Sequence, residues 1–119
     1  MFYGSLTFSQ TMLVDDINYT SQALVDILLS NSCSTNSNVS MSSNQSVAYF
    51  NGNNSIFPIQ EGIIIRSGIA SYTQGTFTGN QLNSQVTTNG DTDLQNISNQ
   101  SGQTSTITDA AYLQFDFVP

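Results

Sequence analysis

The sequence predicts a mainly β fold, an antiparallel β-sandwich-like arrangement, complete or incomplete, with one short N-terminal α-helix. Three observations predict it. Residues 111–118 alternate strictly, with Ala, Leu, Phe and Phe on one face and Tyr, Gln, Asp and Val on the other, which is the period of a half-buried strand. Residues 62–65 read Gly-Ile-Ile-Ile, a run typical of a strand buried on both faces. Residues 21–29 carry apolar side chains at helical spacing.

The helix is the first predicted element. Its apolar residues lie three and four positions apart: Leu24, Ile27 and Leu28. Thr20 or Ser21 can cap its N-terminus, because hydroxyl oxygens accept from the free N–H groups of a first turn. The Ser-Asn-Ser at residues 30–32 ends it, since these side chains compete for backbone hydrogen bonds. The apolar face then has to pack on a sheet.

Short strands and turns follow the helix. Residues 34–46 are almost purely polar, which predicts either a weak edge strand or a loop. Residues 47–50 form a strand candidate, and the Asn-Gly-Asn-Asn at 51–54 predicts a turn because Asn and Gly tolerate positive φ. Residues 56–59 are apolar, but Pro58 confines them to an edge or to the start of a strand.

A long connection separates the apolar run at 62–65 from the last strand. Residues 67–102 contain few apolar side chains and several glycines, with a possible strand at residues 72–77. So long a stretch without firm structure predicts either a functional loop or an undetected element.

The composition restricts the function. The chain has no His and no Lys, and one Arg and eight acidic residues give it a net charge of -7. Few side chains can therefore transfer a proton near neutral pH, which argues against an enzyme. The missing basic surface argues against nucleic acid and against anionic membranes, and no apolar run is long enough to insert into a membrane. The lone Cys33 is either a small buried or partly buried thiol or is paired with a cysteine outside this chain.

The first residues resemble a processing signal. Residues 1–10 are apolar in part and end in a small-x-small pattern, so they are interpreted as the remnant of a signal peptide, or else as a first strand. Residues 11–119 then form a single β-rich domain or the N-terminal half of one.

Three carboxylates are the candidate metal ligands. Asp91 and Asp93 alternate in a Gly-rich segment, and Asp109 lies before the last strand. Ca²⁺ takes six to eight oxygen ligands, so it is the one cofactor that this pattern suggests. The alternative is structural, because Asp91 can form a turn and Asp109 can cap the approach to the strand.

Four aromatic residues are the candidate ligand-binding platform: Tyr72, Phe77, Tyr49 and Tyr112. Together with Asn and Gln amides they can bind a sugar. The alternative is that they belong to the core, where aromatic residues at strand spacing are usually found.

Several motifs, in order, carry a family resemblance. They are Tyr19-Thr20 with Leu24-Val25, Phe57-Pro58 with Glu61-Gly62-Ile63-Ile64 and Ser67-Gly68, Gly90-Asp91-Thr92-Asp93-Leu94, and the closing run from Thr108 to Pro119. Over residues 18–119 the chain resembles the N-terminal half of the choice-of-anchor L domain of Bacteroidetes-type surface proteins. The resemblance implies a protein exported through a Sec signal and commonly retained by a sorting domain, as in type IX secretion. It also implies that Pro119 lies inside a domain.

The resulting expectation is a secreted, non-catalytic binding or adhesion module at a bacterial cell surface. The first alternative is a structural subunit of an extracellular fibre, because half a sandwich leaves an open edge that pairs with another strand. The second is a calcium-dependent carbohydrate-binding module. The expected partners are an extracellular protein, a glycan, or neighbouring copies of the same or a related chain.

Overall fold

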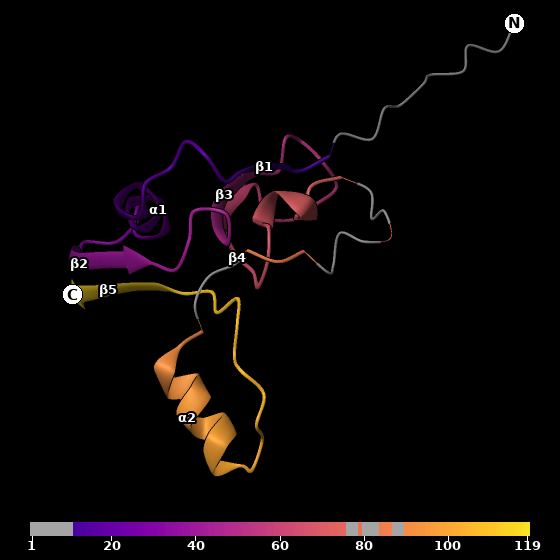
Figure 1. The fold of residues 1–119 in the computed structure, drawn as a ribbon. Helices are drawn as coiled ribbons and strands as arrows, with labels where there is room; N and C mark the ends of the chain where they lie inside the picture. The colour runs from indigo at the N-terminus through magenta and orange to yellow at the C-terminus, as the bar shows by residue number, and fades with distance from the viewer. Residues whose placement is uncertain (1–10, 76–78, 80–83, 87–89) are drawn as a thin grey trace, which may run out of the picture.

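The computed structural model describes residues 11–75, 79, 84–86 and 90–119, and the predicted signal segment lies outside these ranges. In chain order the elements are β1 (Leu13–Asp15), α1 (Ser21–Leu28), β2 (Thr35–Met41), β3 (Val47–Asn51), β4 (Glu61–Ile65), the 3₁₀-helix η1 (Ala70–Thr73), α2 (Thr92–Gln100) and β5 (Leu113–Val118). The strands form two antiparallel sheets (Figure 1), which confirms the mainly β fold class.

The three-stranded sheet has the order β1-β3-β4, with β3 in the centre. Leu13 pairs with Asn51 and Asp15 pairs with Tyr49 across β1 and β3. Residues directly opposite each other in a sheet share a face, so these four side chains belong to one face. The second sheet pairs β2 with β5, with a register shift between Ser37 and Ser40.

The predicted start and end of α1 are confirmed. The Thr20 side chain accepts a hydrogen bond from the backbone N–H of Ala23 at 3.2 Å. Beyond the helix the Ser32 hydroxyl donates to the Leu29 carbonyl at 2.9 Å, which satisfies an acceptor that the helix leaves open.

The buried side of α1 differs from the predicted one. Leu24 and Val25 are fully buried, whereas Leu28 is 51 % exposed. The helix lies against β2 and β4, and this direction of approach brings position 25 toward the core in place of position 28. The spacing of the apolar residues alone could not distinguish a buried face that includes position 25 from one that includes position 28.

The prediction that residues 62–65 are buried on both faces is wrong. Within the described residues β4 pairs with β3 alone, and Ile65 is 50 % exposed. The core strand is β3, whose Val47, Ala48 and Phe50 are buried. In β5, which pairs with β2 alone among the described residues, Phe117 is 56 % exposed.

Two close contacts fix the geometry of β3 and β4. A side chain at Gly62 would come within 2.9 Å of the buried Phe50 ring, so a larger residue here would force that ring to move. Phe57 meets the same ring edge-on, with the ring centroids 5.7 Å apart. The predicted turn between these strands is confirmed by positive φ at Asn53 and Asn54, but residues 56–59 form no strand and Ile56 is 98 % exposed.

The long connection contains two helical elements that the sequence did not reveal. Tyr72 lies in η1, so the strand predicted at residues 72–77 is wrong over its described part. The second element, α2, buries no side chain and projects away from the sheets (Figure 1). Its apolar residues are too few to reveal a helix by periodicity.

Two further observations concern the surface. Cys33 is exposed, so its interpretation as a buried thiol is wrong. Neither α1 nor α2, nor any other helix in the described ranges, has the length and apolar character needed to cross a membrane.

Candidate functional site

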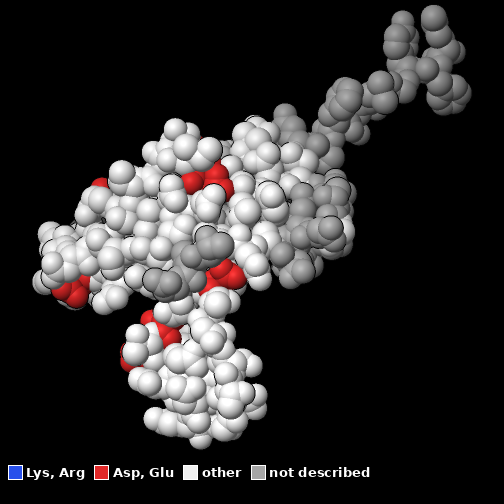
Figure 2. All heavy atoms as spheres, viewed as in Figure 1, with Lys and Arg blue, Asp and Glu red and all other residues white. Residues whose placement is uncertain are grey.

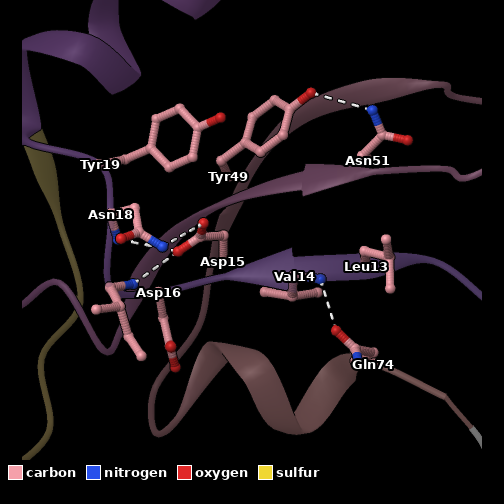
Figure 3. Close-up of a pocket in the computed structure, with 10 residues that line it drawn as sticks. Leu13, Val14, Asp15, Asp16, Asn18, Tyr19, Tyr49, Asn51 and Gln74 are labelled. Carbon is pink, nitrogen blue, oxygen red and sulfur yellow. Dashed lines mark hydrogen bonds between the residues drawn. The ribbon is translucent and has the colours of Figure 1, made fainter.

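A hollow of about 540 Å³ lies beside β1 (Figure 3). It is lined by β1, by residues 16–19 of the connection to α1, by Tyr49 and Asn51 of β3, and by Gln74 after η1. Strand pairing explains part of this convergence, because Tyr49 and Asn51 are the register partners of Asp15 and Leu13.

A tight turn after β1 brings residues 16–19 to the hollow. One carboxylate oxygen of Asp15 accepts from the backbone N–H groups of Ile17 and Asn18, at 3.0 and 2.9 Å. The other accepts from the Asn18 side-chain amide at 2.9 Å. The amide bond from Asn18, followed by the two backbone bonds, holds the pKa of Asp15 below its usual value. This turn directs the chain so that Tyr19 reaches β3.

Tyr19 and Tyr49 stack on each other, with ring centroids 4.7 Å apart and an angle of 27° between the rings. Such pairs are worth about 0.5–1.5 kcal/mol beyond the area that they bury. Figure 3 shows both rings on the same side of β1 as Asp15 and Asn18. The stack therefore forms an aromatic wall beside polar groups.

The Tyr49 hydroxyl is held by both neighbouring side chains of its sheet face. It accepts from the Asn51 amide at 3.3 Å and donates to Glu61 at 3.1 Å. The Asn51 bond lowers the pKa of Tyr49, but desolvation together with the hydrogen bond and negative charge of Glu61 outweighs it, so the pKa is raised. The phenol thus stays protonated at neutral pH.

Gln74 and Asp16 add polar groups on the other side of β1 (Figure 3). The Gln74 side-chain oxygen accepts from the Val14 backbone at 2.8 Å, which fixes its amide and leaves the nitrogen able to donate. Within the described part of the chain, the Asp16 carboxylate and the Tyr19 hydroxyl form no hydrogen bond. The hollow therefore offers both donors and acceptors.

The charged side chains at the site are acidic: Asp15 and Asp16 line the hollow, and Glu61 accepts from the Tyr49 hydroxyl beside it. On the face shown in Figure 2 the acidic side chains are separated by uncharged surface, and no basic side chain is visible. Arg66, the sole basic residue of the sequence, donates to Thr73 in η1 at 3.2 Å and so takes part in the fold. No cation lines the hollow.

The candidate metal ligands have separate local roles. Asp91 caps α2, accepting from the backbone N–H groups of Asp93 and Leu94 at 3.0 and 2.9 Å. Asp93 lies in the first turn, and Asp109 accepts from the Val86 backbone at 3.1 Å. In the ranges that the structure describes, no three acidic, thiol or imidazole side chains lie close enough to share a metal ion. Calcium binding by these aspartates stays a prediction.

The candidate aromatic platform is only partly brought together. Tyr49 lines the hollow, whereas Tyr72 and Tyr112 do not and are 45 % and 43 % exposed. Phe77 lies outside the described residues. Sequence reasoning missed Tyr19, although the Asp-x-x-Asn spacing before it is a recognisable turn signal that places the next residue beside the strand.

Comparison with known proteins gives one family. The model of the choice-of-anchor L domain matches residues 13–119. No curated protein and no solved structure matches the chain. The match covers every helix and strand described above and both sides of the hollow.

Proposed function

The chain belongs to the choice-of-anchor L domain family, and from that premise we propose that it is an adhesion module that binds a neutral, hydroxyl-rich glycan in the hollow beside β1. Family membership indicates a secreted or surface protein, of a class that is generally non-catalytic. The adhesive role, the glycan and the export to a bacterial surface by a type IX route are the proposed part.

The stacked pair of Tyr19 and Tyr49 is the observation that carries the proposal. Binding sites combine apolar or aromatic walls with a few well-placed polar groups, and this hollow has both. A sugar ring presents C–H groups that pack on an aromatic face and hydroxyls that both donate and accept. The Tyr19 hydroxyl, which lies on the same side of β1 as the stacked rings, can pair with such hydroxyls.

The charge of the site disfavours an anionic ligand, and hydrogen bonding within the site limits the coordination of a cation. An anion would find no basic group in the lining. A cation would find the Asp15 carboxylate already engaged in three hydrogen bonds. Asp16 is the other carboxylate in the lining, and it lies on the opposite side of β1 from the tyrosines.

The open strand edges favour a second candidate, a fibre subunit. Among the described residues β4 and β5 each pair on one side only, and an unpaired edge is a template for another strand. Sedimentation and electron microscopy separate the two candidates. Filaments at micromolar concentration would support the fibre subunit, and a monomer that binds glycan would support adhesion.

The direct test is a glycan array with three variants. Tyr49→Ala should lower the affinity for any retained glycan at least tenfold, which corresponds to about 1.4 kcal/mol. Tyr49→Phe should retain most of the affinity, because it keeps the ring. Tyr72→Ala is the matched control, since it removes an exposed tyrosine outside the hollow, and it should change nothing.

Three results bear against the proposal. The first is a wild-type protein that retains no glycan on the array. The second is an equal loss in Tyr49→Ala and Tyr72→Ala, which would place binding elsewhere. The third is loss of binding on addition of EDTA, which would support the calcium-dependent module instead. Circular dichroism and thermal melts of each variant establish that the fold is intact.

A further inference from the structure

A second hollow, also of about 540 Å³, is lined in part by the segment that precedes α1. Its own lining comes from the start of α1 and from the end of β2 with the connection to β3: Thr20, Ser21, Met41, Ser43 and Asn44. Ile17, Asn18 and Tyr19 line this hollow and the first one alike. The two hollows are therefore adjacent and share one wall.

The shared wall is partly apolar, and two of its three residues, Ile17 and Asn18, are exposed. Ile17 is 78 % exposed, so its side chain stands in solvent between the hollows. Tyr19 is half-buried, and one face of its ring is occupied by Tyr49. A ligand that crosses this wall can contact Ile17 and the edge of Tyr19 while it occupies both hollows.

The second hollow shares hydroxyl and amide groups with the first, but among the described residues it has no charged side chain. Its lining offers hydroxyls and an amide beside the Met41 thioether. Ser43 accepts from the Gln45 backbone at 3.1 Å and can still donate its own proton. Asn44 is exposed, and its amide has no hydrogen-bond partner in the described part of the chain.

We propose that the two hollows are subsites of one site for an extended, neutral oligosaccharide whose chain crosses Tyr19. This inference rests on the proposed function, since it takes the first hollow to bind a sugar. Both hollows offer hydroxyl and amide groups, which successive sugar units can pair with, although only the first has both stacked rings and the carboxylates. An extended peptide is the competing ligand, because β1 is an edge strand among the described residues, but the Val14 N–H that could pair with it already donates to the Gln74 side chain.

Chain length is the variable that tests the inference. Uncharged β-1,4-linked glucose and N-acetylglucosamine oligosaccharides and α-linked mannose oligosaccharides, of one to six units, are titrated by isothermal calorimetry. For the series that binds, affinity should rise at least tenfold from the single unit to the longest chain. The affinity should stop rising at the chain length that fills both hollows.

Variants in the second hollow separate the subsites. Asn44→Ala and Met41→Ala should each lower the affinity for the longer chains at least threefold, and the double variant at least tenfold. None of them should alter binding of the single sugar unit. Tyr49→Ala should weaken chains of every length, and Asn31→Ala, which removes an exposed amide outside both hollows, should have no effect.

The outcomes that would contradict these expectations differ in which proposal they overturn. Sensitivity to Tyr49→Ala without any length dependence would overturn the two-subsite inference and leave the proposed function standing. An equal effect of Asn44→Ala on single units and long chains would also overturn it. Binding of no sugar of any length would overturn the proposed function itself, as would preferential binding of an unstructured peptide.

Discussion

The two α-helices are alike in how they begin and unlike in what they bury. Both are short, and in both a side-chain oxygen caps the first turn, from Thr20 in α1 and from Asp91 in α2. In α1 two residues are fully buried, whereas α2 buries none and leaves Leu94 and Ile97 49 % and 63 % exposed. A capping oxygen fixes where a helix starts, but burial alone decides whether the helix belongs to the core.

The difference in burial between α1 and α2 affects how the site is held. Tyr19 lies one residue before the cap of α1, so the packing of α1 also holds the wall shared by the two hollows. The second helix is held mainly by its own return segment, where the Ile107 backbone donates to the Gln95 side chain at 2.8 Å. We therefore expect α1 to support binding and α2 to be independent of it.

Removing the buried side chain of α1 should have the largest effect. Leu24→Ala is expected to lower the free energy of unfolding by about 2–5 kcal/mol, because it leaves a cavity at a fully buried position. Leu94→Ala in α2 is the matched variant and should cost less than about 0.5 kcal/mol. Urea denaturation measures both, and similar losses would show that α2 packs as α1 does.

Removing the two helix caps should give a smaller difference in stability between the α1 and α2 variants. Thr20→Ala is expected to cost about 1 kcal/mol of global stability, because α1 unfolds only with the core. Asp91→Ala should leave the global transition unchanged and accelerate amide exchange in α2 alone. A lower urea midpoint for Asp91→Ala would contradict the independence of α2.

The turn that positions Tyr19 should show a pH-dependent contribution. The pKa of Asp15 is lowered in the folded protein, so the ionised carboxylate stabilises the fold above the unfolded-state pKa of about 3.9. This contribution is lost as the pH falls through the folded-state pKa. The stability difference between wild type and Asp15→Asn should therefore be constant from pH 5 to 7 and shrink below pH 4. A difference that grows in acid would contradict this assignment.

The smallest expected effect is that of pH on binding. The raised pKa of Tyr49 keeps its phenol protonated, and Asp15 stays ionised, across neutral pH. Sugar affinity should therefore be constant within a factor of two between pH 5 and 9. A change in sugar affinity with a midpoint near pH 7 would show that another group controls binding.

The sequence predicted the elements that have strong local signals. The helix at residues 21–29 and the strand at residues 111–118 were recognisable because periodicity and a capping hydroxyl agree with the tertiary structure. Burial was predicted less well. Gly62-Ile63-Ile64-Ile65 resembles a strand buried on both faces, but its burial depends on what packs on those faces, and the sequence of the strand does not reveal that.

The site was harder to predict than the fold. Tyr49 was identified as a candidate, but its partner Tyr19 is distant in sequence and meets it only through the Asp15 turn and the pairing of β1 with β3. The polar sequence of α2 concealed a helix that its Asp91 cap begins. Local patterns reveal caps and turns, whereas the convergence of separate strands needs the fold.

The most direct measurement is a chemical-shift map of the ¹⁵N-labelled protein titrated with the oligosaccharide that binds most tightly. The amide signals that move should come from β1 and residues 16–19, from Tyr49 and Asn51, and from residues 41–44, while those of α2 stay in place. Shifts confined to α2 or to the exposed apolar loop at residues 56–59 would contradict a binding site at the stacked tyrosines.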